Sequence, residues 1–119
     1  MAISDYAAGK VVATVAIGTG VDGAGYDPST GDAFASNADG TLTVIHQDGP
    51  DSYRVAETVT TMQASRNMGL DATTHRIYLA GAKFGPAPKD STAANPRRRP
   101  PMLPGSFVVM VVERGARAP

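Results

Sequence analysis

The chain has 119 residues, no cysteine, and eleven basic residues against eleven acidic ones. Zero net charge argues against a dedicated binder of nucleic acid or of anionic membranes, and the lack of cysteine excludes disulfides, zinc–thiolate sites and thiol catalysis. Thirteen glycines, nine prolines and 42% hydrophobic residues favour one domain of short strands and turns over helices.

The N-terminal segment does not resemble a targeting sequence. Met1–Asp5 lacks the basic start and the apolar run of a secretory signal. No stretch approaches the roughly 20 apolar residues of a membrane span, so we expect no membrane association. A chain without cysteine suits an oxidising or a reducing space, which leaves the compartment open.

The first predicted elements are two strands joined by a turn. Met1–Ser4 and Lys10–Ile17 have strand character, and Asp5–Gly9 connects them. Both sets of alternating residues in Lys10–Ile17 are mostly apolar, so both faces of the strand are apolar. Such a strand is expected to be covered on both sides.

Residues 18–60 predict one complete four-stranded unit. Turn residues separate its strands, and Asp39-Gly40 is a dipeptide typical of a tight turn that needs a positive φ. The expected strands are Gly23–Tyr26, Asp32–Ser36, Thr41–Gln47 and Tyr53–Thr60. Small residues in the first of these strands indicate a place where neighbouring backbones approach closely.

The same pattern returns 44 residues later. Tyr26–Ser36 recurs as Leu70–Ala80, and Lys10–Val15 recurs as Arg54–Val59 at the same offset. A period of this length, built from short strands and Gly/Asp/Pro turns, is typical of a β-propeller blade. The fold class predicted is therefore all-β, with four-stranded antiparallel blades and a ring that one chain leaves incomplete.

The last predicted unit, residues 61–113, contains an insertion. Strands are expected at Asn67–Leu70 and Arg76–Ala80 before the pattern breaks. Aligning Thr41 with Ser106 gives an offset of 65, so about 21 residues are inserted within the segment 81–105. Phe107–Val112 resumes as an apolar strand, and 114–119 is a tail.

The segments GKVVATVAIG and GVDGAGYDPSTGDAFASNADGTLTVI resemble the YVTN-type β-propeller family over residues 1–81 and 105–113. The second copy departs from that pattern, since Ala72 and His75 replace the Pro and Gly of the turn. The resemblance implies that 1–17 is a partial blade, consisting of its third and outermost strands. It also implies an exported or periplasmic protein whose relatives mostly serve as binding or scaffold proteins.

Several motifs favour structure over chemistry. Gly18–Gly23 has the G-x-G-x-x-G spacing, but the expected strand and the following Asp27-Pro28 leave no place for the helix of a nucleotide site. His46 and His75 match no metal-ligand spacing and would need carboxylates from Asp22, Asp27 or Asp71. Asp27 and Asp71 occupy equivalent repeat positions, which predicts turn capping.

Two groups of residues are candidates for binding. Arg97, Arg98 and Arg99 lie between prolines in the insertion, where extended guanidinium groups could bind phosphate, carboxylate or an acidic partner. The alternative is a solvated loop that covers the edge of a blade. Asp22 and Asn67 are the polar side chains expected to face a central channel. No catalytic residue, cofactor or metal ligand is assigned.

The sequence thus predicts a non-catalytic binding or scaffold protein. Because nine strands make two blades and a remainder, we expect a cyclic homo-oligomer of about three or four chains, each lending its N-terminal strand to a neighbour's last blade. A partner protein or a small anionic ligand is expected, and no specific nucleic acid. The alternatives are a fragment of a longer propeller, a lactonase-like or lyase-like enzyme, and a metal-binding propeller with its site at the channel mouth.

Overall fold

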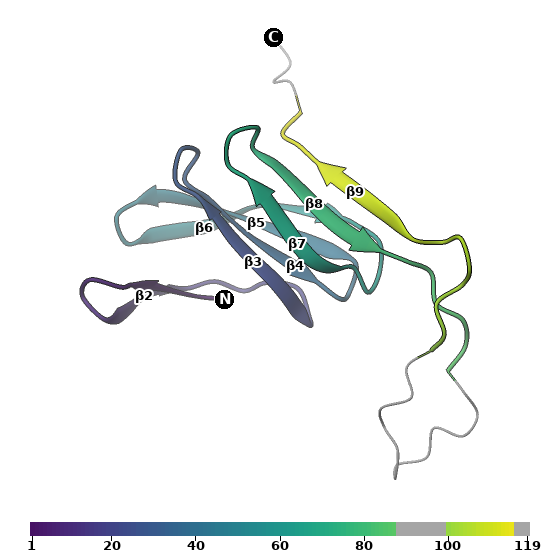
Figure 1. Ribbon diagram of the computed structural model, residues 1–119. Helices are drawn as coiled ribbons and strands as arrows, with labels where there is room; N and C mark the ends of the chain where they lie inside the picture. The colour runs from purple at the N-terminus through teal and green to yellow at the C-terminus, as the bar shows by residue number, and fades with distance from the viewer. Residues whose placement is uncertain (88–99, 116–119) are drawn as a thin grey trace.

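The computed structural model describes residues 1–87 and 100–115. They form three antiparallel sheets that pack face to face, with the four-stranded sheet in the middle (Figure 1). None of the described residues belongs to a helix long and apolar enough to cross a membrane. The strands are β1 (Ala2–Asp5) and β2 (Lys10–Thr14) in the first sheet; β3 (Val21–Asp27), β4 (Asp32–Asn37), β5 (Thr41–Gly49) and β6 (Ser52–Thr60) in the middle sheet; and β7 (Arg66–Asp71), β8 (Arg76–Gly81) and β9 (Val108–Val112) in the third sheet.

The all-β prediction is confirmed, and so is the order of the strands. Every sheet pairs strands that follow one another along the chain, in the orders β1-β2, β3-β4-β5-β6 and β7-β8-β9. Most strand ends agree with the sequence pattern within a few residues. The strand expected over Lys10–Ile17 is shorter, since β2 ends at Thr14.

The turns adopt the backbone conformations that the sequence predicts. Gly40 has a φ of 88°, Gly31 has 71°, and His75, which stands 44 residues after Gly31, has 59°. Histidine tolerates this left-handed region better than most residues with a side chain. His75 therefore replaces a turn glycine without changing the path of the backbone.

The middle sheet is covered on both faces. All six residues of β4 are buried. On one face Phe34 and Leu42 pack against Ile77 and Leu79 of the third sheet. On the other face the hairpin of β1 and β2 packs through Val15 and neighbouring apolar residues against Ala33 and Ile45. The core is thus two layers of side chains between three sheets.

The middle and third sheets approach closely at one side and diverge at the other. A Cβ atom on Gly23 of β3 would lie 2.8 Å from the Cβ of Met68 on β7, so only glycine fits there. Towards β6 the sheets separate, and a cleft of about 650 Å³ lies between Val59 of β6 and Val112 of β9. The two sheets therefore form a wedge.

The insertion is longer than the sequence alignment predicts. Asn37 pairs with Thr41 in the middle sheet, and Gly81, 44 residues after Asn37, pairs with Val108 in the third sheet. Thr41 thus corresponds to Val108 at an offset of 67, and the alignment with Ser106 was wrong by two residues. Because side chains alternate with a period of two, a shift of two residues keeps every side chain on its face, and the apolar pattern cannot reveal it.

The base of the insertion is an ordered ladder. The amide of Gly85 donates to the carbonyl oxygen of Pro101 at 2.8 Å, and the amide of Leu103 donates to that of Lys83 at 2.8 Å. Phe84 and Met102 form an antiparallel bridge between these bonds. The two ends of the segment Gly81–Gly105 therefore have regular antiparallel pairing, which continues beyond β8 and β9.

Replacing Gly40 by valine is expected to lower the free energy of unfolding by about 1–3 kcal/mol, because a β-branched residue is strained at its positive φ. A side chain there would also lie 3.3 Å from the backbone of Gln63 and from the carbonyl oxygen of Thr61. Urea unfolding followed by circular dichroism measures the loss. Gly49→Val is the control, since Gly49 has no positive φ and its nearest neighbour would lie at 4.0 Å. Equal losses in both variants would contradict the strain at Gly40.

Candidate functional site in the cleft between two sheets

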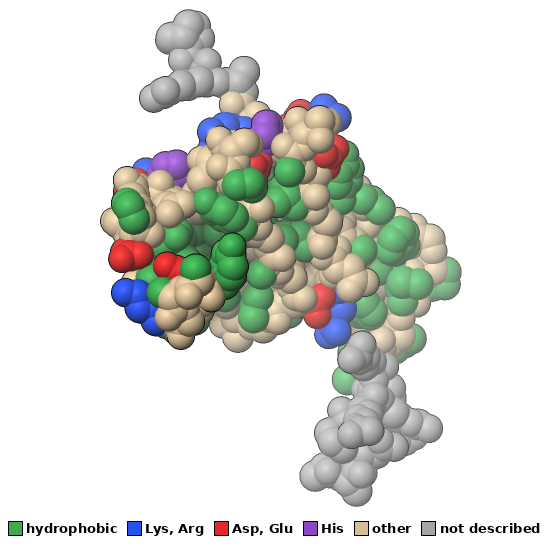
Figure 2. Space-filling model, turned by 60° about the vertical axis from the view of Figure 1, so that its left-hand side comes forward, with side chains coloured by type: hydrophobic (Ala, Val, Ile, Leu, Met, Phe, Trp, Pro, Cys, Tyr) green, Lys and Arg blue, Asp and Glu red, His purple; other side chains and the backbone are tan. Residues whose placement is uncertain are grey.

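The cleft between the middle and third sheets has an apolar floor and a polar end. Apolar side chains of both sheets line the floor. They are Phe34, Leu42, Val44, Val59, Ile77 and Val112. Both histidines line the polar end together with acidic and basic side chains, and Figure 2 shows the histidines (purple) among such charged groups.

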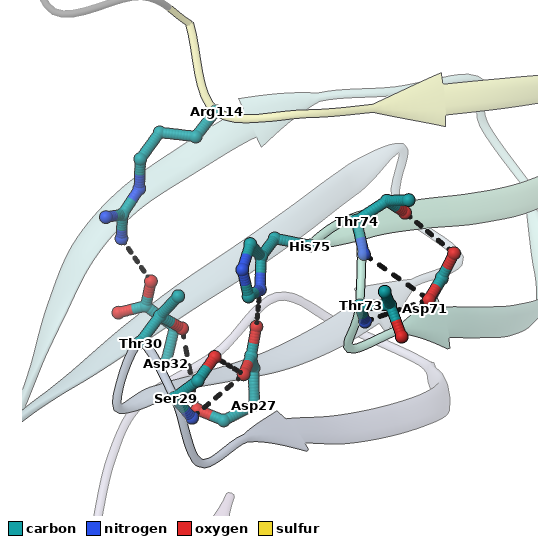
Figure 3. Close-up of polar contacts among 9 residues, drawn as sticks. All are labelled: Asp27, Ser29, Thr30, Asp32, Asp71, Thr73, Thr74, His75 and Arg114. Atoms are coloured by element: carbon teal, nitrogen blue, oxygen red, sulfur yellow. Dashed lines mark hydrogen bonds and ion pairs between the residues drawn. The ribbon is translucent and has the colours of Figure 1, made fainter.

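Asp27 links the two sheets at this end of the cleft. The carboxylate is 1% exposed and accepts hydrogen bonds from the Ser29 hydroxyl at 2.6 Å and from the Ser29 amide at 3.0 Å. Its second oxygen lies 2.6 Å from Nδ1 of His75, which belongs to the turn between β7 and β8 (Figure 3). Asp27 therefore caps its own turn and holds the turn of the next sheet.

These contacts stabilise the ionised form of Asp27. The hydrogen bond from the Ser29 hydroxyl, followed by the contact with His75, lowers the pKa of Asp27 from 3.8 to about 2, although burial acts in the opposite direction. The equivalent residue Asp71 has its pKa lowered by the hydroxyl of Thr74 within its own turn. The prediction that both aspartates cap turns is confirmed.

A second buried carboxylate joins three elements. Asp32, at the start of β4, lies 2.7 Å from Nδ1 of His46 on β5, and it also accepts a hydrogen bond from the guanidinium of Arg114, which follows β9. Since Asp32 belongs to the middle sheet and Arg114 follows the last strand of the third sheet, this pair is a second link across the cleft. Figure 3 shows Arg114 reaching down to Asp32 beside the pair of His75 and Asp27.

Two further ion pairs lie near this end of the cleft. Arg54 contacts Asp48 at 3.0 Å, and Arg76 contacts Glu113 at 2.8 Å. The contact with Glu113 raises the pKa of Arg76 above its usual range. All four side chains are substantially exposed to water, so these pairs contribute little to stability.

The chemistry available at the polar end comes from the two histidines. A carboxylate only accepts hydrogen bonds, so each imidazole presents an N–H at Nδ1 to its aspartate, and Nε2 lies outside the pair. Such carboxylate–histidine pairs orient an imidazole for proton transfer or for metal binding. Within residues 1–87 and 100–115, no group of three or more His, Cys, Asp or Glu side chains is arranged to hold a metal ion.

The structure brings together one of the two predicted site groups. The amide of Asn67 on β7 donates to the Asp22 carboxylate of β3 at 2.9 Å, and both residues are exposed at the side where the sheets approach most closely. Whether they face a channel stays a prediction. Arg97, Arg98 and Arg99 lie outside the described residues.

Sequence reasoning missed most of the polar end. Nothing in the repeat marks Asp32, His46 or Arg114 as neighbours, since Arg114 lies 82 residues after Asp32. A signal did exist for His75. His75 stands at the repeat position of Gly31, where the pattern has a glycine. If the two sheets stack in register, a polar side chain at this position lies next to the corresponding turn of the middle sheet, which contains Asp27.

Replacing Asp27 by asparagine is expected to weaken the acid dependence of stability. A lowered pKa means that the ionised carboxylate stabilises the fold above about pH 4 and that this contribution is lost as the pH falls towards about 2. Asp27→Asn should therefore unfold at a lower temperature than the wild type at pH 7, with a smaller further decrease between pH 4 and pH 2. Thermal unfolding at a series of pH values measures both.

The matched control for this variant is Asp71→Asn, which alters the equivalent turn without touching a contact between sheets. The pKa of Asp71 is also lowered, chiefly by the hydroxyl of Thr74, so Asp71→Asn should lose that contribution alone and keep the decrease in stability that depends on Asp27. Identical pH profiles for Asp27→Asn and the wild type would contradict the stabilisation of ionised Asp27 by Ser29 and His75.

No family model matches the chain, and searches of curated proteins and of solved structures find no similar protein.

Proposed function

We propose that the chain is a non-catalytic binding or scaffold module of the β-propeller type, in which several copies assemble head-to-tail into a closed ring. The wedge formed by the middle and third sheets carries this proposal. Their contact is tight at Gly23 and Met68, while a cleft separates Val59 from Val112. Sheets that stack as wedges turn about a common axis, and closed propellers contain about four to eight of them.

The third sheet supports assembly because it has an unpaired edge. Among the described residues, β9 pairs with β8 alone. Phe107, Val109 and Val111 are largely exposed there. An open apolar edge promotes aggregation unless another strand or sheet covers it. A neighbouring chain in the ring would provide that cover.

The N-terminal hairpin is the element that we propose each chain lends to its neighbour. The repeat pattern predicted this role for the N-terminal strand Lys10–Ile17 alone. Because β2 is paired with β1 over four positions, from Ala2 with Thr14 to Asp5 with Lys10, the two strands would be lent together as one hairpin. The hairpin packs on the middle sheet through side chains such as Val15 and does not pair with its strands.

The ring would hold a partner protein or a small anionic ligand. The candidates for this contact remain Arg97, Arg98 and Arg99, together with Asp22 and Asn67 at the side where β3 and β7 meet. No cofactor is assigned to the chain.

The proposal predicts the mass of the protein in solution. Light scattering at micromolar concentration should give about three or four times the chain mass of 12.3 kDa. Removing residues 1–17 should abolish the assembly, because the hairpin would no longer reach a neighbour. A well-folded monomer of the full chain would refute the ring.

A second candidate function is favoured by the carboxylate–histidine pairs. His46 and His75 both line the cleft, and each holds Nδ1 against a buried aspartate. This arrangement supports an enzyme or a metal-binding protein whose site lies in the cleft and not at a channel mouth. Screening divalent ions by thermal shift tests it. Strong stabilisation by one ion, lost in His46→Gln and His75→Gln, would favour this candidate over a non-catalytic module.

A further inference from the structure

None of the described strands covers one face of the third sheet, which we call the open face and define as Gly69, Tyr78, Val109 and Val111. The residues beside them in each strand, such as Leu79 and Met110, point to the middle sheet and pack there. Strand alternation places the four residues on the opposite side. Tyr78 pairs with both Gly69 and Val111, so the three form one row across the sheet.

The equivalent face of the middle sheet is covered, and its residues can be compared with those of the open face. The equivalents of the open face in the middle sheet, listed in the same order, are Gly25, Phe34, Leu42 and Val44. There the third sheet covers them, and Leu42 is 0% exposed whereas Val109 is 55% exposed. Phe34 is 8% exposed and Tyr78 37%. The open face therefore has the residue types of an interface between sheets, but no strand in the described part of the chain covers it.

The covering surface in the chain's own interface comes from Met68, Leu70, Ile77 and Leu79 of the third sheet. The repeat places Ala24, Tyr26, Ala33 and Ala35 at the same positions of the middle sheet. Three of these four line a groove of about 610 Å³ beside the hairpin of β1 and β2. We call the surface formed by Ala24, Tyr26 and Ala33 together with the adjoining hairpin the groove.

The groove fits an uncharged sheet face. Among the described side chains that line it, none is from Asp, Glu, Lys or Arg, and Tyr26 is 48% exposed. The open face is likewise built from glycine, tyrosine and valine. A charged peptide or a nucleic acid finds no oppositely charged side chain among the described residues of either surface, whereas an apolar sheet buries both.

We propose that the open face of one copy packs into the groove of a second copy, repeating between chains the interface that already joins the middle and third sheets. This inference rests on the proposed function, and it names the two surfaces that meet. The surfaces differ, so the contact is heterologous, and each copy keeps one of each kind for the next chain. The contact places the third sheet of one copy on the middle sheet of the next, so that the sheets of successive chains stack in the same order.

Lysine variants on each surface test the proposal. Val109→Lys with Val111→Lys should block the open face, and Ala24→Lys with Tyr26→Lys should block the groove. All four side chains are exposed, so both double variants should keep the circular dichroism of the wild type. Each variant alone should sediment as a monomer. A 1:1 mixture should form a heterodimer of twice the chain mass, because one intact open face then meets one intact groove.

The control is Val55→Lys, which adds the same charge at an exposed valine outside both surfaces and should assemble as the wild type does. A wild type that is itself monomeric would overturn the ring and this inference together. An oligomeric wild type whose lysine variants still assemble, or whose mixture stays monomeric, would overturn only the inference and point to another occupant of the groove.

A cross-link checks the geometry without relying on charge. A Cβ on Gly25 would lie 3.6 Å from the Cβ of Leu70, and the equivalent pair between chains is Gly69 with Tyr26. That separation lies within the range of about 3.5–4.5 Å that a disulfide requires. The chain has no cysteine of its own. Under mild oxidation, Gly69→Cys mixed with Tyr26→Cys should therefore form a cross-linked heterodimer.

Gly69→Cys mixed with Val55→Cys is the matched control for the cross-link and should not form a heterodimer at a comparable rate. Equal rates for the two mixtures would overturn the proposed contact.

Discussion

Leu42→Ala is expected to lower the free energy of unfolding by about 2–5 kcal/mol, because it leaves a cavity in the layer that joins two sheets. Leu42 is 0% exposed and belongs to one cluster with Phe34, Ile77 and Leu79. The loss should include the attachment of the third sheet, since half of this cluster belongs to that sheet. Chemical denaturation monitored by circular dichroism measures the change.

The control for this substitution is Val21→Ala on β3, where the side chain is 55% exposed. Surface truncations of this kind usually change stability by less than about 0.5 kcal/mol. If Val21→Ala reduced stability as much as Leu42→Ala, the packing of the third sheet on the middle sheet would be wrong.

Gly23→Val is expected to lower the free energy of unfolding by about 1–3 kcal/mol or more, because the added side chain must displace β7. A Cβ there would lie 2.8 Å from the Cβ of Met68 and 3.3 Å from its backbone nitrogen. Neither atom is the end of a flexible side chain, so rotation of Met68 cannot relieve the contact. The measurement is again denaturant unfolding.

A double-mutant cycle with Met68→Gly is the control. Removing the Cβ of Met68 takes away the nearest atom, so Gly23→Val should cost less stability in the Met68→Gly background than in the wild type. Additive losses would mean that the two sheets do not meet at these residues.

The strands were predictable because their signals are local. Alternating side chains, the turn at Asp39-Gly40 and the recurrence of Tyr26–Ser36 depend only on neighbours in sequence. The register of β9 was not predictable, since a shift of two residues leaves every apolar side chain on the same face. Hydrogen-bond partners across the sheet, such as Gly81 with Val108, decide that register.

The candidate site was predictable in part. Asp27 and Asp71 were assigned to turns from their repeat positions, and both accept hydrogen bonds there. The contact of Asp27 with His75 depends on how one sheet stacks on the next, and the contact of Asp32 with Arg114 joins residues 82 positions apart. Such pairs follow from tertiary packing, about which composition and spacing carry little information.

The order of the strands has a consequence for how a chain of this kind can lengthen. Within the described residues, each sheet is built from strands that follow one another along the chain. Duplicating a segment of 44 residues would add a sheet to the end of the stack without threading the chain through existing ones. Contacts in such stacks join nearest neighbours, so an added unit has to match only the sheets directly beside it. Gene duplication and recombination can therefore vary the number of sheets one unit at a time.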